Sequence, residues 1–541
     1  MTKETSETMF SRVSVAAVAV ILIASIYVIS NASFFFHGNQ IEFGDFADNA
    51  LRITNAKHFA EIYGNYSRWG FYHPGPAFWY LYAAGEYLFH DWLRVSSPHA
   101  AHVLIGIVFQ VTCAVIAVLY LAQKTSLTVV PIAIALLFVH WNSMLGAPNS
   151  IWPPHVLFGP FLLLIAFGAG VASGDAKLLP IVIFAGGMLL HGHVAQPLFV
   201  IPLGCLALIS AVRGGAYKNA YLAISALILA VFVLPIIVDA LRGSNSNIAT
   251  IFHHIKTHAG DRHTLSQGIG YFLSFFLYEA KQNVVQGSAT FSLASYLWAH
   301  PTLWLVIALI AACALTPLTR AARFLKWYSA FVTISVVLSA AWGAMQDGEM
   351  YDFNGNFIYA VVYLLYLFPW LLAGSAISPS KYSCILGGSV AVAALWNMSH
   401  GYMHSATKGL SGMFAPKPIF TIVVASDQFD LDLKAMTQGA SGVYVSFKPE
   451  RQFEAFAIIN QINHLGIPFR VRDGYSFLYT TKVQKHEPEL SIEVCGDTGP
   501  ILPHPYNLPG NPAPCHITVT SVPTGSQPNS RGKTLTREDH R

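Results

Sequence analysis

Two aspartates, Asp45 and Asp48, follow the first apolar stretch of the chain. Because they are three residues apart, a helix would place them on one face. Gly44 directly before them also suits the start of a helix, where Asp45 would cap backbone N–H groups and Asp48 would occupy the favoured first turn. The sequence leaves a chemical role and a capping role open for the pair, and for Asp48 it favours capping.

Cationic and imidazole side chains gather in two long polar segments, 32–97 and 241–296, called here the first loop and the second loop. Such groups suit an anionic group of a substrate. The candidates for binding an anion are Arg68, His73, Lys256, His258, Arg262 and His263. A third polar group, at a turn between two short apolar runs, is either a solvated turn or the wall of a substrate pocket. Its members are His191, His193 and Gln196, to which Tyr72 of the first loop is added.

His254 and His258 have the spacing of metal ligands, since residues four apart share one face of a helix. No Glu or Cys stands near them in the sequence, and we therefore interpret the segment as a plain polar stretch at the membrane surface. We interpret Asp347, Glu349 and Asp352 as a solvated loop. The sequence thus predicts no metal-ligating residues, and the need for a divalent cation, Mg²⁺ or Mn²⁺, stays open.

The composition shows which elements must position these residues. Of the 541 residues, 54 % are hydrophobic and only 11 % are charged, whereas soluble domains have about 25 % charged residues. These values exclude a secreted soluble enzyme, a disordered scaffold and a disulfide-rich toxin. The net charge of +4 is small and dispersed, which argues against a nucleic-acid partner. The chain is expected to be a polytopic membrane protein.

Apolar runs of about 20 residues predict about eleven transmembrane helices. They lie at 13–30, 98–122, 127–145, 152–172, 179–195, 198–212, 219–240, 297–316, 325–344, 357–375 and 382–399. A cytoplasmic N-terminus places the basic residues of the short loops on the cytoplasmic side, in agreement with the positive-inside rule. These residues are Lys124, Lys177, Arg213, Lys218, Arg320, Arg323, Lys326 and Lys381. Both long loops and the C-terminus then lie on the outer face.

The pattern changes after the last apolar run. Strand-like segments at 419–425, 442–447, 467–471 and 475–480 alternate with an amphipathic helix at 449–465, which predicts a small α/β domain over 411–524. Residues 525–541 are expected to form a disordered tail. Cys495 and Cys515 are the only cysteines of this polar region, and on the outer face a disulfide between them is expected.

The first loop resembles a known family. It combines Gly44-Asp45 just after the first span with Tyr-Ser-Arg-Trp-Gly at 66–70 and His-Pro-Gly-Pro at 73–76, before an aromatic helix expected at Ala77–His90. This arrangement resembles the GT-C superfamily of integral-membrane glycosyltransferases, in an uncharacterised bacterial branch. The resemblance covers the spans up to about residue 400 and implies an all-α polytopic membrane domain over 1–410 with both long loops outside. The aromatic helix is expected to lie at the membrane interface.

The resemblance also implies the chemistry and the location. Enzymes of this superfamily use polyprenyl-phosphate-linked sugars, and their base is an acidic residue of the first outer loop. The resemblance therefore implies that the anion-binding candidates hold the departing phosphate, on which negative charge grows, and that the third polar group is the wall of an acceptor pocket. That role maps by position onto Asp45 and, as the second choice, onto Asp48, because the chain has no adjacent Asp-Glu pair. A single carboxylate favours direct displacement with inversion at the anomeric carbon. The expected location is the bacterial inner membrane, with the C-terminal domain in the periplasm, and the acceptor is an envelope glycan, a lipid or a protein.

Two other functions are compatible with a chain of this kind. A multi-span transporter or flippase would also carry polar groups among many helices. Against it, charged residues are almost absent from the predicted spans, and no pair of broken helices recurs in two related halves. A lipid-diphosphate-glycan ligase or polymerase would use the same outer face with a different donor.

Overall fold

The computed structural model describes most of residues 3–376 and parts of the C-terminal region. Up to 376, the residues outside the described part are 31, 37–39, 43, 68, 96, 144–150, 215–218, 259, 261 and 278–290. Beyond 376, the described residues are 423–424, 434–435, 437, 442–448, 452–471, 490–494 and 517–521. Cys495, Cys515, the tail at 525–541 and the predicted span at 382–399 therefore lie outside the described residues.

The chain divides into two compact units. The helical unit comprises Met1–Gly38 and Ile53–Ile419, and the α/β unit comprises Asn39–Arg52 and Phe420–Arg541. The first turns of helix α3 (Asp45–Lys57), with both candidate aspartates, therefore belong to the same unit as the C-terminal domain. Composition could not predict this membership, because it depends on pairing between residues far apart in the sequence.

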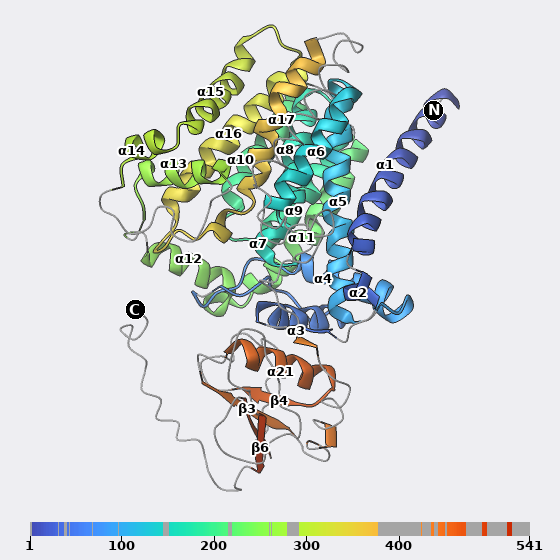
Figure 1. Ribbon diagram of the computed structural model, residues 1–541, viewed down its shortest axis with the longest axis vertical. Helices are drawn as coiled ribbons and strands as arrows, with labels where there is room; N and C mark the ends of the chain where they lie inside the picture. The colour runs from blue at the N-terminus through green and yellow to red at the C-terminus, as the bar shows by residue number, and fades with distance from the viewer. Residues whose placement is uncertain are drawn as a thin grey trace. The chain divides into compact units, whose positions relative to one another are not determined.

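The helical unit consists of long and short helices joined by connections of different lengths (Figure 1). Its first helices are α1 (Lys3–Ser30), α2 (Ala32–Phe36), α4 (Ala77–Gly85), the π-helix Glu86–Trp92, α5 (Pro98–Lys124), α6 (Val130–Ser143), α7 (Pro153–Val156), α8 (Phe158–Ser173) and α9 (Leu179–Gly192). There follow α10 (Pro197–Arg213), α11 (Asn219–Ala240), α12 (Asn247–Thr257), α13 (Leu265–Ser274), α14 (Leu293–Ala299), α15 (Thr302–Leu315), α16 (Arg323–Met345) and α17 (Ile358–Ala376). Short 3₁₀ turns lie at Leu127–Val129, Ala176–Leu178, Gly243–Asn245, Phe275–Leu277, Thr316–Leu318 and Asp352–Gly355.

Helix α8 is the centre of this unit. It is apolar on all sides, which is typical of a helix surrounded by other helices, and nearly all of its side chains are buried. Helices α5, α9, α10, α16 and α17 pack around it. Helix α11 is also strongly apolar, but only 6 % of its most apolar 18-residue stretch is buried, so most of this helix faces outward.

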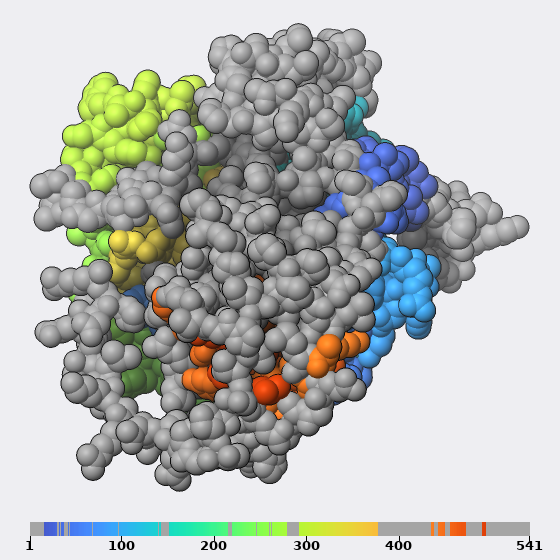
Figure 2. Space-filling view, turned by 60° about the horizontal axis from the view of Figure 1, so that its bottom comes forward, coloured from blue at the N-terminus to red at the C-terminus, as the bar shows by residue number. Residues whose placement is uncertain are grey.

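Among the described residues, five helices are long and apolar enough to cross a membrane, and the bent pair of Leu293–Ala299 with Thr302–Leu318 would make a sixth span. Each predicted span before residue 376 contains a helix, although several of these helices are short. The α14–α15 segment, lime in Figure 2, lies on the surface of the helical unit, where Trp298, Trp304 and Leu305 are exposed. Exposed aromatic and aliphatic side chains of this kind suit contact with lipid.

The described residues of the α/β unit form two small sheets. Strands β1 (Gln40–Ile41) and β2 (Val423–Val424) pair antiparallel. The second sheet has the order β4-β3-β5-β6, formed by β3 (Val443–Phe447), β4 (Phe469–Val471), β5 (Leu490–Val494) and β6 (Ile517–Ser521). Strand β3 is parallel to β4 and β5, and β6 is antiparallel to β5.

The sequence located part of this unit correctly. The strands expected at 442–447 and 467–471 correspond to β3 and β4, and the expected helix at 449–465 is α21 (Gln452–His464). The sequence analysis missed β5 and β6, and the strand expected at 475–480 falls outside the described residues. Parallel pairing of β3 with β4 requires a crossover, which α21 provides.

Candidate functional site

Both candidate aspartates lie in the first turn of α3. Gly44 directly before the helix has a positive φ of 58°, a conformation that glycine adopts without steric cost. Its carbonyl oxygen accepts hydrogen bonds from the N–H groups of Ala47 and Asp48, at 2.9 and 3.4 Å. The sequence Gly-Asp thus starts the helix and places two carboxylates where the helix dipole favours negative charge.

The two aspartates have different surroundings. Asp48 is fully buried, and its Oδ2 accepts a hydrogen bond of 3.1 Å from Nε of Arg52, one helical turn away. Arg52 is itself only 1 % exposed. Asp45 is half-buried and is the more accessible carboxylate. A buried ion pair of this kind suits a structural role, and helix capping by Asp48 stays a prediction.

The first loop folds back on itself after α3. Tyr66 and Tyr72 form an antiparallel bridge, and the N–H of Ser67 donates to the carbonyl oxygen of Phe71 at 2.7 Å. Gly70 at the turn has a φ of 77°, which explains the glycine in Tyr-Ser-Arg-Trp-Gly. Arg68 lies outside the described residues, and its role in phosphate binding stays a prediction.

His73 packs against the turn after α9. Its Nδ1 accepts a hydrogen bond from the N–H of Val194 at 3.2 Å. The imidazoles of His73 and His193 lie 4.5 Å apart between ring centroids, and both residues are buried. The structure therefore brings together two residues that the sequence placed in separate groups, one for the phosphate and one for the acceptor pocket.

The next residues of the loop approach α9 closely. The N–H of Gly75 points at the carbonyl oxygen of His191, 3.4 Å away. A Cβ atom on Gly75 would stand 2.5 Å from the imidazole of His191, so only glycine fits between the two prolines of His-Pro-Gly-Pro. The motif therefore fixes the first loop against the end of α9.

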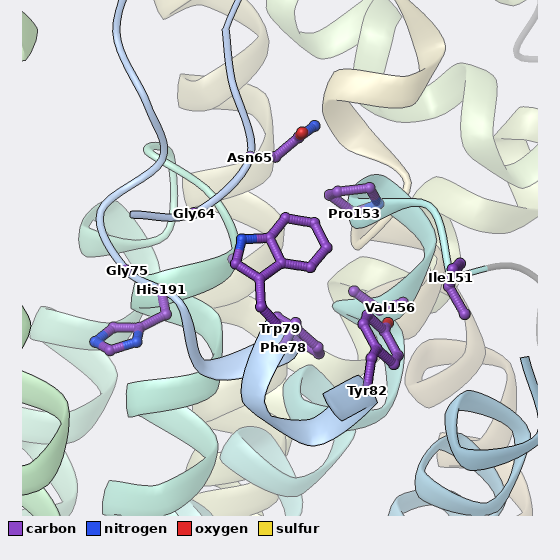
Figure 3. A pocket seen from close by; sticks show the side chains of 11 residues that line it. Gly64, Asn65, Gly75, Phe78, Trp79, Tyr82, Ile151, Pro153, Val156 and His191 are labelled. Atoms are coloured by element: carbon purple, nitrogen blue, oxygen red, sulfur yellow. The ribbon is translucent and has the colours of Figure 1, made fainter. Parts of the chain in front are cut away.

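A narrow pocket opens at this junction (Figure 3). Segments of the first loop, α4, α7 and α9 line it, through Gly64, Asn65, Gly75, Phe78, Trp79, Tyr82, Ile151, Pro153, Val156, His191 and Gly192. Four buried polar atoms of these residues have no hydrogen-bond partner among the described residues: Asn65 Oδ1, Trp79 Nε1, Tyr82 OH and His191 Nδ1. Buried polar atoms are nearly always paired, so such a group of unpaired atoms points to a polar ligand or ordered water.

The residues predicted to form an acceptor pocket make contacts in and around this pocket. His191 Nε2 lies 2.6 Å from the carbonyl oxygen of Phe232. The backbone of Tyr72 makes two hydrogen bonds with the side chain of Asn247, at 2.7 and 2.8 Å. Gln196 is fully buried next to the turn, and neither polar atom of its side chain has a partner among the described residues. Of the four predicted acceptor-pocket residues, only His191 lines the pocket.

Asp239 joins the two loops at the end of α11. Its carboxylate accepts hydrogen bonds from Tyr63 OH at 2.9 Å and from the N–H groups of Asn247 and Ile248, each at 3.0 Å. Arg242 donates to the oxygen of Tyr63 at 2.6 Å. Burial and the neighbouring Asp239 carboxylate raise the pKa of Tyr63 to about 12. Sequence analysis missed Asp239, although a lone carboxylate at the end of an apolar helix is a signal that could have found it.

The second loop meets the first at Trp69. The indole of Trp69 lies 5.1 Å from the ring of His254 and 5.4 Å from that of His258, between centroids. Lys256 and Arg262, the other predicted phosphate-binding residues, are exposed. His254 Nε2 lies 2.8 Å from Asp347 Oδ2. The interpretation of Asp347 as part of a merely solvated loop was therefore wrong, because the fold brings it to the histidines of α12.

The aromatic segment also differs from its prediction. Phe78, Trp79 and Tyr82 are buried inside the helical unit, and Tyr87 remains exposed. The interfacial interpretation therefore fails for the buried rings, because α4 packs against α5 and α9. The expected helix to His90 continues as the π-helix Glu86–Trp92, a form that often marks a functional position.

A partly buried charge network holds this π-helix. Glu86 Oε1 lies 2.6 Å from Lys57 Nζ, Glu86 Oε2 lies 2.7 Å from His102 Nε2, and Lys57 also contacts Asp91 at 3.0 Å. Burial alone would raise the pKa of Glu86, but His102 and Lys57 outweigh burial and hold that pKa at about 2. The network anchors the last turn of α3, and sequence reasoning missed it.

Comparisons with known proteins give matches among solved structures only. No family model matches the chain, and no curated protein matches it. The chain is similar to ArnT from Cupriavidus metallidurans bound to undecaprenyl phosphate, with 11 % identity over 88 % of this chain and 93 % of that one, at a TM-score of 0.49. It is also similar to the archaeal oligosaccharyltransferase AglB from Archaeoglobus fulgidus in complex with an inhibitory peptide and a dolichol-phosphate. That match has 12 % identity over 89 % of this chain and 69 % of that one, at a TM-score of 0.34.

Both matches have TM-scores below 0.5 and sequence identities of 11 and 12 %, so neither carries an argument about the family or function of this chain. At these TM-scores the likeness says nothing about individual residues. The roles of the site residues are therefore argued from this chain alone.

Proposed function

We propose that this protein is a membrane glycosyltransferase that transfers a sugar from a polyprenyl-phosphate donor to an envelope acceptor on the extracytoplasmic face. Asp45 takes the proton from the acceptor hydroxyl. The acceptor oxygen bonds to the anomeric carbon as the bond from that carbon to the phosphate breaks, and polyprenyl phosphate leaves. One displacement at this carbon inverts its configuration.

The different surroundings of the two aspartates are the observation that most supports this assignment. A general base must reach the proton it abstracts. Asp48 is fully buried and is paired with Arg52, whereas Asp45 is half-buried in the same helical turn. The chain thus offers one carboxylate for the structure of α3 and one for chemistry.

The polar groups of the two loops suit the rest of the substrate. Arg68, His73, Lys256, His258 and Arg262 are the proposed donor-phosphate residues, of which Lys256 and Arg262 are exposed cations. The unpaired polar atoms of the narrow pocket, on Asn65, Trp79, Tyr82 and His191, include both donors and acceptors. Such a mixed set suits a hydroxyl group, and because the pocket has room for little more than a water molecule, we propose that it receives a single substrate hydroxyl.

Mass spectrometry of envelope glycans tests the proposal. Cells with the wild-type chain, with no chain, with Asp45→Asn, with Asp48→Asn and with both substitutions together are compared at equal protein levels in the membrane. Asp45→Asn keeps the shape of the side chain and removes the proton acceptor, so transfer should fall by ~10²-fold or more. Each variant must still insert into the membrane. Reduced transfer is then not explained by loss of the protein.

The same experiment separates the competing functions. Normal glycans in both single variants and in the double variant would overturn the proposal and favour a transporter or flippase. Release of a lipid diphosphate in place of a lipid monophosphate would instead identify a ligase or polymerase. Loss of transfer in Asp48→Asn alone would move the base from Asp45 to Asp48, three residues further along α3.

A further inference from the structure

The second loop and the segment after α16 bring together two imidazoles and one carboxylate. His254 lies on α12, and His258 follows directly after its end. Their rings stack with centroids 4.1 Å apart, and Asp347 Oδ2 lies 2.8 Å from His254 Nε2. One ligand atom from each of the three residues lies within 4.8 Å of the other two.

These distances fit a single small cation. Two ligand atoms at the usual zinc distances of about 2.0–2.1 Å in a tetrahedral arrangement stand about 3.4 Å apart. His254 Nε2 and Asp347 Oδ2 are 2.8 Å apart, and no two of the three ligand atoms are more than 4.8 Å apart, so this distance and this limit lie on either side of the tetrahedral value. Small side-chain rotations therefore suffice to close the three groups around an ion.

The backbone already holds the ligands in place. Asp347 forms an antiparallel bridge with Arg262, the N–H of His263 donates to the carbonyl oxygen of Ala344 at 3.0 Å, and His263 Nε2 lies 2.6 Å from the carbonyl oxygen of Gly348. His258 Nδ1 lies 3.1 Å from the carbonyl oxygen of His254. A contact of this kind commonly orients a metal-binding imidazole with Nε2 toward the ion.

The surroundings are apolar on one side and open on another. The rings of Trp69 and Phe71 lie 5.1 and 5.3 Å from His254, between centroids. The side chain of His254 is 12 % exposed and that of Asp347 is 25 % exposed. Solvent ions can therefore reach the cluster, while the aromatic rings restrict the motion of the imidazole.

We propose that His254, His258 and Asp347 form a binding site for a zinc-class divalent cation that fastens the second loop to the segment after α16. Two imidazoles and a carboxylate suit Zn²⁺ better than Mg²⁺, which prefers oxygen ligands alone. Three protein ligands leave a fourth position for water or an oxygen of another ligand. The site does not depend on the glycosyltransferase assignment.

Metal analysis of the purified full-length chain in detergent tests this site. The protein is treated with a chelator, incubated with Zn²⁺, desalted, and analysed by elemental mass spectrometry together with a competition titration of affinity. The wild type should retain about one Zn²⁺ per chain. Each of His254→Gln, His258→Gln and Asp347→Asn should weaken Zn²⁺ binding by more than about 100-fold. Substitution of residues that only hydrogen-bond to metal ligands typically weakens binding by about 10- to 100-fold.

His253→Gln is the matched control. His253 is adjacent in sequence, exposed, and not a member of the cluster, so this variant should bind Zn²⁺ like the wild type. A shift of the thermal unfolding midpoint on addition of Zn²⁺ should appear in the wild type and in His253→Gln, and be lost in the three ligand variants. This second readout remains informative where a ligand variant is less stable without metal.

Three results would overturn the proposal. The first is a wild type that retains no Zn²⁺ and shows no shift of its unfolding midpoint. The second is a set of ligand variants that bind Zn²⁺ as tightly as His253→Gln. The third is binding of Mg²⁺ with an affinity equal to that of Zn²⁺, which would exclude a site of this class.

Discussion

Arg52 is among the largest fully buried side chains of the described residues, and its Nε contacts Asp48 at 3.1 Å. An ion pair removed from water is stable only while both partners remain. The stability of α3, and with it the placement of Asp45, therefore depends on a residue that takes no part in the proposed reaction.

The variant Arg52→Ala tests this dependence. It leaves Asp48 buried without its positive neighbour, and breaking a buried pair typically costs about 3–5 kcal/mol. The thermal unfolding midpoint of the detergent-solubilised protein should fall clearly below that of the wild type. Arg320→Ala, which removes an exposed arginine, should leave the midpoint nearly unchanged. Equal midpoints for both variants would contradict a structural role for Arg52.

The sequence predicted some of these residues and missed their partners for a physical reason. Gly44-Asp45 and Asp48 indicate a helix start because capping depends on residues a few positions apart. His254 and Asp347 are 93 positions apart, so only the tertiary fold makes them neighbours. The histidine spacing was visible in the sequence, and the carboxylate needed to interpret it was not.

At the scale of elements, the π-helix Glu86–Trp92 joins α4 to the network of Lys57 and His102. An extra residue per turn leaves no clear mark on hydrophobic periodicity, so the sequence predicted a plain helix there. The visible signal was the presence of Glu86 and Asp91 in an otherwise aromatic and apolar segment, because a charge in such a place needs partners.

The depressed pKa of Glu86 makes the stability of the fold depend on pH in the acidic range. A carboxylate with a pKa of about 2 in the folded protein and about 4.5 when unfolded stabilises the fold above the higher value. That contribution, on the order of 3 kcal/mol, is lost as the pH falls from about 4.5 to about 2. Glu86→Gln should therefore lower the unfolding midpoint at neutral pH and reduce its decline in acid. Parallel pH profiles for the variant and the wild type would contradict this linkage.

Strands β5 and β6 allow a sharper prediction for the two polar cysteines. Their antiparallel register pairs Val494 with Ile517. Cys495 directly follows β5 in the sequence, and Cys515 stands two residues before β6. The chain thus leaves β5 and enters β6 at the same end of the strand pair, near each cysteine.

We therefore expect Cys495 and Cys515 to form a disulfide when the domain is exposed to an oxidising compartment. Closing a loop of this length stabilises the fold by about 3 kcal/mol in the chain-entropy model. Peptide mass spectrometry without reduction should find the two cysteine peptides linked. Alkylation of both thiols in the denatured, unreduced protein would exclude the bond.

At the scale of the whole molecule, hydropathy predicted where helices form better than which helices span a membrane. Helix α8 is buried among other helices, while α11 faces outward, yet both have high mean hydropathy. Composition reports the apolar character of a segment and does not distinguish burial in protein from contact with lipid. Packing against α5, α9 and α10 makes that distinction for α8.

The orientation of the chain decides whether the proposed chemistry has access to extracytoplasmic acceptors. The short loops carry Lys124, Lys177, Arg213 and Arg320, and the positive-inside rule places such loops in the cytoplasm. Reporter fusions after Lys177 and after Gly401 should give a cytoplasmic signal at the first position and an extracytoplasmic one at the second. A fusion after Arg320 serves as a second control and should also give a cytoplasmic signal. A cytoplasmic signal after Gly401 would place the C-terminal domain inside, in a compartment where Cys495 and Cys515 stay reduced.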